Sequence, residues 1–434
     1  MRCPFSLILS ILLTLPLLGQ SDYQRTAALA EALEDSVITW RRHVHQYPEL
    51  SNREVNTAAY IADHLRALGL EVHTGVAHTG VVGILRGGQA GKTVALRADI
   101  DALPVTERAD LPFASKATGT YRGEEVGVMH ACGHDTHVAM LMGAAEVLSQ
   151  QREDLPGTVV FLFQPAEEGA PEGEEGGAEL MVKEGVLKDY DVSAAFGIHI
   201  NSQTPVGHVN YRPGGAMAAS NSFTITISGK QAHGSTPWAG VDPITAAAQV
   251  VVGLQMIVAR QTELTKEPAV ISVGKIEGGV RSNIIPEEVT LIGTIRTLDE
   301  EMKEEIFERI RTTATNIAAS SGATAEVKID GGYPVTFNDP TMTERMLPTV
   351  QATVGADNVH LVRPITGAED FSFFAREVPS LFLFVGGMDP AMDRSEAPGH
   401  HTPDFLIDER GLLHGVKLYA NLALDYLHGA ADGK

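Results

Sequence analysis

Cysteine is nearly absent from this 434-residue chain, which contains only Cys3 and Cys132. Cys3 lies in an N-terminal segment, residues 1–21, that we expect to be removed. The mature chain would then hold one thiol, and one thiol excludes an internal disulfide. A lone thiol in an exported protein is either buried and inert or held by a bound group, and a metal ion would hold it.

Long apolar runs are also absent beyond the N-terminus. The run at residues 5–18 follows Arg2 and precedes the small residues Gly19 and Ser21, which is the pattern of a secretory signal peptide. A membrane-spanning helix needs roughly 20 apolar residues, and this run is shorter. We therefore predict export to the periplasm or the cell exterior, with no membrane attachment after cleavage. An uncleaved N-terminal anchor is the alternative, and no later segment looks able to cross a bilayer.

Basic residues are scarce relative to acidic ones: 33 Lys and Arg face 55 Asp and Glu, for a net charge of −22. Binding to nucleic-acid phosphates needs clustered Lys and Arg, and no basic run or aromatic-rich basic patch is present. The composition therefore argues against a nucleic-acid partner. With 44% hydrophobic residues over this length, we expect two domains rather than one.

Chemically versatile residues concentrate in MHACGHDTH, residues 129–137, which holds three histidines, the mature chain's one thiol and an aspartate. An apolar helical pattern follows at residues 138–148, and another lies at residues 56–68. Taken alone, the motif also fits a structural metal site or a helix start capped by Asp135 and Thr136.

Four apolar runs of strand length precede further polar or glycine residues. The runs are residues 93–96, 158–163, 192–198 and 380–385, and they lead to Asp99 and Asp101, Glu167 and Glu168, His199, and Gly386 with Gly387. Continuous apolar runs are typical of strands covered on both faces. Since ligands of open α/β sheets bind beyond the carboxyl ends of strands, these side chains should converge. We predict an α/β domain with a mixed, largely parallel sheet flanked by helices.

A second pattern occupies residues 217–331. Its strand-like runs are residues 222–228, 269–276, 288–296 and 325–330, and helical runs lie at residues 243–260 and after Asp299. The order β-α-β-β-α-β is that of a ferredoxin-like α+β domain. We predict that this domain is inserted between two parts of the first domain, residues 22–216 and 332–434.

The converging residues fit a site for two divalent metal ions. Such ions lie roughly 3.5–4 Å apart and need several ligands, one of which usually bridges them. The candidates are Cys132, His134, Glu168, His199 and one of the pair His400 and His401. Thiolate and imidazole favour zinc, and the carboxylates keep manganese possible.

Glu167 and Glu168 are neighbours at the expected end of a strand, so we predict that their side chains point to opposite sides. One would bind metal, and the other would accept a proton from water. The pair alone would also suit an exposed loop, and His199 alone would suit a hydrogen-bonded core histidine.

Nine ordered motifs resemble one family, the co-catalytic metallopeptidases that include aminoacylases and glutamate carboxypeptidases. They look most like its branch of hippurate and indole-acetyl-amino-acid hydrolases. The motifs are RRHVHQYPELSNREVNTAAYI (41–61), LRADIDALPV (96–105), MHACGHDTHVAML (129–141), FQPAEEG (163–169), GIHI (197–200), GKQAHGSTPWAGVDP (229–243), RSNIIPEEV (281–289), TGAEDFSFF (366–374) and HHTPDF (400–405). The resemblance implies a zinc-exopeptidase-like fold whose inserted domain acts as a lid and forms a homodimer.

The resemblance also implies roles for individual residues. It makes Glu167 the general base and His233 a lid histidine that stabilises the oxyanion, often in the partner subunit. Asn283 and Arg296 match residues that hold the substrate carboxylate, although Asn283 also suits a turn and Arg296 a solvated charge. The implied metal ligands are Cys132 as the bridge, His134, Glu168, His199 and His401.

Other residues of the motifs are expected to support these ligands. Asp99 and Asp101 would orient them, His130 and His137 would lie behind them or be structural, and His45 would be structural. The chain departs from the family at Trp238, where many relatives carry histidine, and in an acidic loop at residues 169–177. Both departures bear on substrate choice.

We predict an exported amidohydrolase that cleaves N-acyl amino acids with metal-activated water. A metallo-carboxypeptidase or dipeptidase of the same family is the alternative. Outside the family, Cys132 with His134 or His137 could form a cysteine hydrolase, or the chain could bind metal without catalysis.

Overall fold

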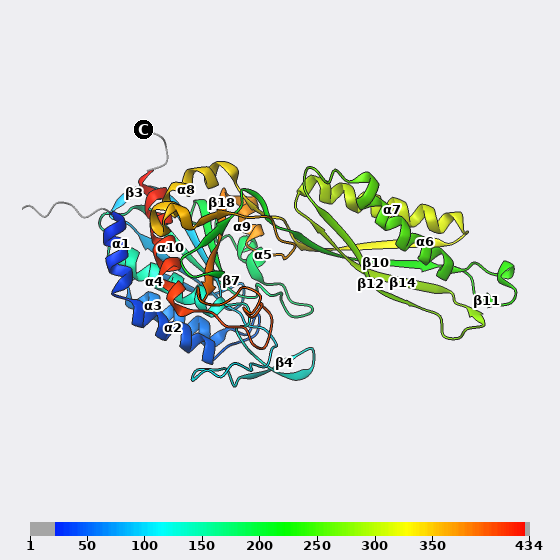
Figure 1. The fold of residues 1–434 in the computed structure, drawn as a ribbon, viewed down its shortest axis with the longest axis horizontal. Helices are drawn as coiled ribbons and strands as arrows, with labels where there is room; N and C mark the ends of the chain where they lie inside the picture. The colour runs from blue at the N-terminus through cyan, green and yellow to red at the C-terminus, as the bar shows by residue number, and fades with distance from the viewer. Residues whose placement is uncertain (1–21, 430–434) are drawn as a thin grey trace, which may run out of the picture.

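The computed structural model describes residues 22–429, which form a large domain and a smaller one connected by long strands (Figure 1). The predicted signal peptide lies outside the described residues. The chain enters the small domain through β10 (Ala219–Ser228) and leaves it through β15 (Thr324–Tyr333). The small domain is therefore an insertion in the large one.

One eight-stranded sheet organises the large domain. Its order is β1 (Glu71–Val76), β2 (Gly80–Arg86), β6 (Pro156–Gln164), β3 (Gln89–Asp99), β7 (Val192–Pro205), β18 (Ser380–Met388), β8 (Val209–Tyr211) and β17 (Val359–Leu361). The central strands β6, β3, β7 and β18 run parallel, and antiparallel pairs lie toward both edges. The predicted mixed, largely parallel sheet is confirmed.

Helices cover both faces of this sheet, which explains the continuous apolar runs of its strands. One face packs against α1 (Asp22–Glu31), α2 (Glu34–Gln46), α3 (Val55–Ala67), α4 (His134–Ser149), α8 (Pro340–Val354) and α10 (Leu412–His428). The other packs against α5 (Gly177–Lys183) and α9 (Ser372–Glu377), on the side of the small domain (Figure 1). Short pairs complete the domain: β4 (Thr118–Tyr121) with β5 (Glu124–Gly127), and β9 (Gly214–Met217) with β16 (Thr336–Asn338).

The small domain has its own core. Its antiparallel sheet has the order β12 (Ala269–Gly278), β14 (Glu288–Thr297), β10 and β15, and α6 (Pro243–Met256) and α7 (Glu300–Ser320) cover one face. Asp299 caps α7 by accepting a hydrogen bond from the Met302 amide at 2.8 Å. This is the ferredoxin-like arrangement that the sequence predicts. A two-stranded pair, β11 (Ala232–His233) with β13 (Ile284–Ile285), lies at its tip.

One helix of the described chain, Pro243–Gln261, is long and apolar enough to cross a membrane, which the sequence analysis did not expect. It comprises α6 and a π-helical turn, η2 (Ile257–Gln261). Ala246, Val250 and Leu254 of α6 are buried in the core of the small domain. Apolar residues of this helix therefore pack against the sheet of the small domain.

Strands β7 and β18 run further than predicted. Their parallel pairing continues from Ala195 with Ser380 to Pro205 with Met388, so His199 lies within β7 and not at its end. Gly386 permits this close pairing, because a Cβ atom there would lie 1.8 Å from the Pro205 carbonyl oxygen. Hydrogen bonds between β7 and β18 keep both strands extended beyond their apolar residues.

We expect Gly386→Ala to lower the free energy of unfolding of the large domain by about 2–3 kcal/mol, because the new methyl group collides with backbone that cannot rotate away. Scanning calorimetry would measure the change. The control is Gly331→Ala in β15, where a Cβ atom would meet nothing within 4 Å. Equal unfolding temperatures for the two variants would contradict the close approach of β7 and β18.

Candidate metal centre

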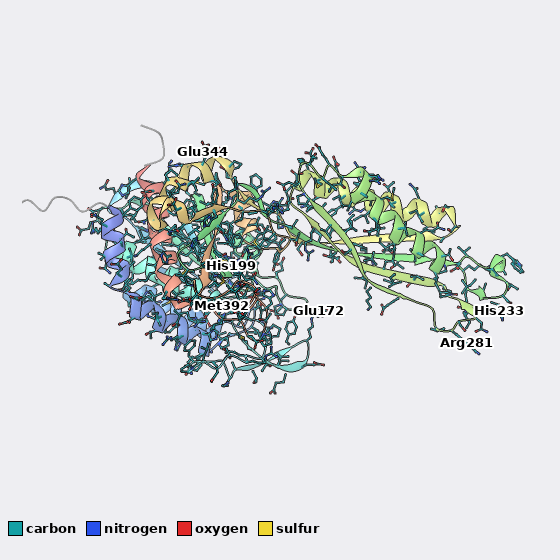
Figure 2. The ribbon with its side chains drawn as sticks, viewed as in Figure 1. Glu172, His199, His233, Arg281, Glu344 and Met392 are labelled. Atoms are coloured by element: carbon teal, nitrogen blue, oxygen red, sulfur yellow. The ribbon has the colours of Figure 1, made fainter. Side chains whose placement is uncertain are left out.

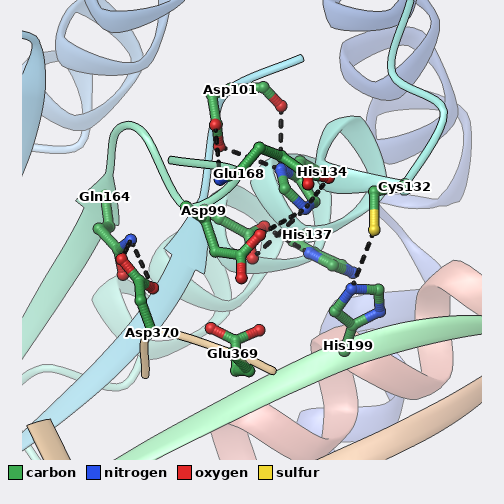
Figure 3. A network of polar contacts seen from close by, with 12 residues as sticks. Asp99, Asp101, Cys132, His134, His137, Gln164, Glu168, His199, Glu369 and Asp370 are labelled. Carbon is green, nitrogen blue, oxygen red and sulfur yellow. Dashed lines mark hydrogen bonds and ion pairs between the residues drawn. The ribbon is translucent and has the colours of Figure 1, made fainter. Parts of the chain in front are cut away.

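The candidate site lies where β3, β6 and β7 meet the start of α4 (Figure 3). Gly133 precedes α4 with a φ of 99°, in the left-handed region that favours glycine. A Cβ atom at this position would lie 2.4 Å from the Ile200 side chain on β7. Gly133 thus lets the backbone between Cys132 and His134 pack directly on β7.

The Cys132 thiol faces two imidazoles. Its Sγ lies 3.4 Å from Nε2 of His199 and 3.3 Å from Nε2 of His401. The other ring nitrogen of His199, Nδ1, donates to the Ile200 carbonyl at 2.6 Å, so Nε2 is the atom that faces Cys132. Burial and the carboxylates of Glu168 and Glu167 raise the pKa of Cys132 well above its usual value. Without a bound cation this cysteine stays a neutral thiol.

The structure distinguishes the two neighbouring histidines, which the residues alone left open. His400 uses both ring nitrogens, since Nδ1 donates to the Cys132 carbonyl at 3.1 Å and Nε2 accepts from the Ser202 amide at 3.2 Å. His401 instead places Nε2 3.3 Å from Oε1 of Glu168. His401 is therefore the member of the pair that faces the cluster.

His134 presents one free nitrogen to the cluster. Its Nδ1 donates to the Asp101 carbonyl at 2.9 Å, which leaves Nε2 buried without a hydrogen-bond partner. That atom lies 3.7 Å from Oε2 of Glu167 and 3.9 Å from Oε1 of Glu168. Burial alone would lower the pKa of His134, and the carboxylates of Asp99 and Asp101 outweigh it and raise the pKa to about 10.

These atoms pass the test of fit for metal ions. Nε2 of His134 is buried without a hydrogen-bond partner, and unpartnered buried polar atoms are rare and need an explanation. Three sets of donor atoms lie within metal-binding reach of one another and share members: Cys132, His134 and His199; Cys132, Glu168 and His401; His134, Glu167 and Glu168. A soft thiolate, imidazoles and carboxylates together suit zinc or manganese.

The expectation that Glu167 and Glu168 point to opposite sides is wrong, since both reach His134. Strand β6 ends at Gln164, so the alternation of a strand no longer applies, and Ala166 turns the chain with a φ of 53°. The buried Glu54 carboxylate supports this turn by accepting from the Ala166 amide at 2.9 Å. The Tyr333 hydroxyl donates to the Glu167 carbonyl at 2.6 Å.

A buried ionic network lies behind Glu167, and sequence reasoning missed it. Arg97 contacts Asp99, Glu369 and Asp370, each at 2.8 Å. Burial and the nearby carboxylates of Glu369 and Glu168 raise the pKa of Glu167 well above its usual value. The motifs at residues 96–105 and 366–374 contain Arg97, Glu369 and Asp370. Arg97 directly follows the apolar run at residues 93–96, and a charged residue at the end of a buried strand could have indicated a buried ion pair.

The supporting residues lie where the sequence analysis expected them. Asp101 contacts His134, and Asp99 accepts from Nδ1 of His137 at 2.5 Å (Figure 3). The other nitrogen of His137 accepts from the Ile200 amide at 2.8 Å. His45 lies 2.9 Å from Asp135 and thus connects α2 to the start of α4. His130 is fully buried, and burial lowers its pKa to about 3.

The structure does not bring two of the three predicted residues of the small domain to this site. His233 lies at the far tip of the small domain, away from His199 (Figure 2). The Asn283 carbonyl accepts from the Gly234 amide at 2.8 Å, which places it at the same tip. Arg296 lies at the other end of the domain, where Ser220 of β10 pairs with Arg296 on one side and with Tyr333 on the other. Their roles remain predictions.

Comparisons with known proteins agree with these motifs. A model of peptidase family M20/M25/M40 matches residues 95–425. Thermostable carboxypeptidase 1 of Saccharolobus solfataricus is 41% identical over 91% of this chain and 96% of its own length. The IAA-amino acid hydrolase ILR1-like 4 of Arabidopsis thaliana is 38% identical over 91% of this chain and 86% of its own length.

A solved structure agrees as well. The YXEP protein of Bacillus subtilis, a dinuclear metal binding peptidase, is 35% identical and superimposes with a TM-score of 0.77 over 92% of this chain and 99% of its own. The family predicted from the motifs is therefore confirmed: this chain belongs to peptidase family M20/M25/M40.

Proposed function

We propose that the chain is an exported, metal-dependent amidohydrolase that cleaves the amide bond of N-acyl amino acids. The observation that carries the proposal is the convergence of thiol, imidazole and carboxylate atoms within metal-binding reach of one another beside Glu167. Two relatives are named for hydrolysis of related bonds, a carboxypeptidase and an indole-acetyl-amino-acid hydrolase. A metallo-carboxypeptidase or dipeptidase with the same centre is the alternative. Export rests on the pattern of residues 1–21.

Cys132, His134, Glu168, His199 and His401 would hold two divalent ions, and the thiolate would lie between them. Such ions polarise a carbonyl group and acidify a water molecule, so that attack on the amide proceeds at neutral pH. A bound cation would also lower the pKa of Cys132, which burial raises, and would thus make its thiolate favourable there.

Glu167 is the group that would move the proton. Its carboxylate is buried and shares its surroundings with Glu369 and Asp370, so its affinity for a proton is high. A base of this kind accepts a proton from water during attack and returns it to the leaving amine. The Tyr333 hydroxyl and the turn at Ala166 hold it in place.

The small domain would complete the site. His233 lies too far away to serve its own chain in this conformation (Figure 2). We infer that it reaches the site of a partner subunit in a homodimer, where it would stabilise the oxyanion. Asn283 and Arg296 would hold the substrate carboxylate. Exposed apolar side chains of the small domain support such an interface: Trp238, Val252, Met256, Ile276 and Val280.

A cysteine hydrolase fits these contacts poorly. Its thiolate would need a lowered pKa, whereas burial raises the pKa of Cys132. Both nitrogens of His137 already have partners, and Nδ1 of His134 is bound to Asp101. A metal-binding protein without catalysis would have no use for the buried carboxylate of Glu167.

Glu167→Gln should retain both metal ions and lose turnover by about 10²–10⁴-fold, because the amide cannot accept the proton. Elemental analysis and the rate of hydrolysis of hippurate or N-acetyl-methionine would measure this. The control is Glu344→Gln, an exposed carboxylate on α8 that lies outside both cavities near the centre, which should keep normal activity. Normal activity in the Glu167 variant would show that Glu167 is not the general base.

A chelator should abolish activity, and added zinc or manganese should restore it, because the thiol alone is not a nucleophile here. Alkylating reagents should leave Cys132 largely unmodified at neutral pH, because a buried thiol with a raised pKa is a poor nucleophile; mass spectrometry would record this. Activity that survives chelation but is lost on alkylation would instead establish a cysteine hydrolase.

Mixing two inactive variants should restore activity if His233 acts across a dimer. Glu167→Gln and His233→Ala should each lose activity, the latter by about 10²–10³-fold as for other oxyanion donors. In a mixed dimer one site has both residues intact. Sedimentation would verify the dimers, and mixed dimers that remain inactive would show that His233 does not act in trans.

A further inference from the structure

A cavity of about 600 Å³ lies along β7, on the carboxyl-terminal side of His199. Alternation along β7 places His199, Asn201 and Gln203 on one face of the strand, where all three are half-buried. Asn201 and Gln203 line the cavity. Two residues along a strand span about 7 Å, so the cavity begins within one side-chain length of the centre.

Phe384 forms the boundary between the two. It pairs with His199 across β18 and β7, its ring centroid lies 6.3 Å from that of His199, and it also lines the cavity. A substrate that extends from the centre into this space would pass along the Phe384 ring.

The cavity is positively charged. Arg363 and Arg394 line it, and neither forms an ion pair within residues 22–429. Arg212 also lines it, but Glu267 neutralises this guanidinium at 2.8 Å. No acidic side chain belongs to the lining of the cavity in the described chain. Unpaired guanidinium groups in a concave site favour a carboxylate.

Two histidines and an apolar wall complete the lining. Nδ1 of His208 lies 2.8 Å from Nε2 of His360, so these rings share one hydrogen bond and each keeps another nitrogen for a ligand. Phe384, Met388 and Val362 supply apolar surface. The lining suits a short aliphatic chain that ends in a carboxylate.

The opposite side of the centre has a different character. A cavity of about 580 Å³ there includes Glu168 and the apolar residues Leu50, Leu103 and Pro104. Its Arg53 is paired with Glu174 at 2.6 Å. Arg122 also lines this cavity, with its guanidinium over the Tyr121 ring, and Glu172 and Glu174 add negative charge. The scissile amide would lie between the two cavities, and of the two only the cavity on the His199 side has no acidic lining residue in the described part of the chain.

We propose that the cavity beside His199 binds a second carboxylate of the substrate, so that the preferred substrates are N-acyl amino acids with two negative charges. The inference rests on the proposed function and adds the substrate class. The second carboxylate belongs either to an acidic amino acid or to a dicarboxylic acyl group. Both present the same chemistry to Arg363 and Arg394.

Two pairs of substrates with matched shapes distinguish these sources. N-acetyl-glutamate is compared with N-acetyl-glutamine, and N-succinyl-alanine with its succinamoyl analogue. In one of these pairs the charged member should have a kcat/KM about 10- to 100-fold higher, as expected for hydrogen bonds to a charged group. The pair that shows the preference identifies which side of the amide lies in the cavity.

Arg363→Gln and Arg394→Gln should each reduce the preference, and the double variant should abolish it. The neutral substrates should keep their kcat/KM. The matched control is Arg376→Gln on α9, an exposed arginine outside the cavity, which should keep the preference. Added salt should also reduce the preference of the unmodified enzyme, because exposed charges are screened.

Equal kcat/KM values within both pairs, with N-acetyl-methionine still hydrolysed, would overturn this inference and leave the proposed function standing. A preference that survives in the double variant would also overturn it. Absence of hydrolysis for every substrate, with metal bound, would overturn the proposed function and this inference together.

Discussion

Arg97 lies among buried carboxylates at the end of the central strands, and it contacts Asp99, Glu369 and Asp370. Glu167 and Asp101 are buried in the same region. Two like charges 4–5 Å apart repel by about 4 kcal/mol at an effective dielectric constant near 20. Burial and this repulsion raise the pKa of Glu167, Glu369 and Asp370. A bound divalent cation would relieve the same repulsion, so the carboxylates that the fold buries here suit a metal centre.

The sheet determines where these charged groups lie relative to one another. Parallel pairing of β6, β3 and β7 brings their polar residues to one edge, and Gly133 lets the start of α4 lie against β7. The small domain has a separate core and a tip far from this edge (Figure 1). The proposed metal ligands therefore belong to the large domain, whereas His233 and Asn283 lie at the tip of the small one.

Much of this site was predictable from local pattern. Cys132 and His134 stand out in the sequence because thiol, imidazole and carboxylate side chains are concentrated in residues 129–137. The β-α-β-β-α-β order was enough to indicate the small domain. The failures came where tertiary contacts override a local rule. Glu167 and Glu168 share a side because β6 stops at Gln164, and His199 lies within β7 because β18 extends the ladder. Arg97, Glu54 and Tyr333 contact residues distant in sequence, so their contacts could not be predicted from spacing along the chain.

The sequence by itself determined the fold class, the family and the chemical types of the donor atoms, because periodicity and motif composition are local properties. Only the tertiary structure decided that His401 and not His400 faces the cluster, since both nitrogens of His400 are used by backbone groups. It also revealed the positive cavity, where Arg363 and Arg394 come together from loops that precede and follow β18. Which charges meet in space depends on chain topology, and spacing along the chain does not carry that information.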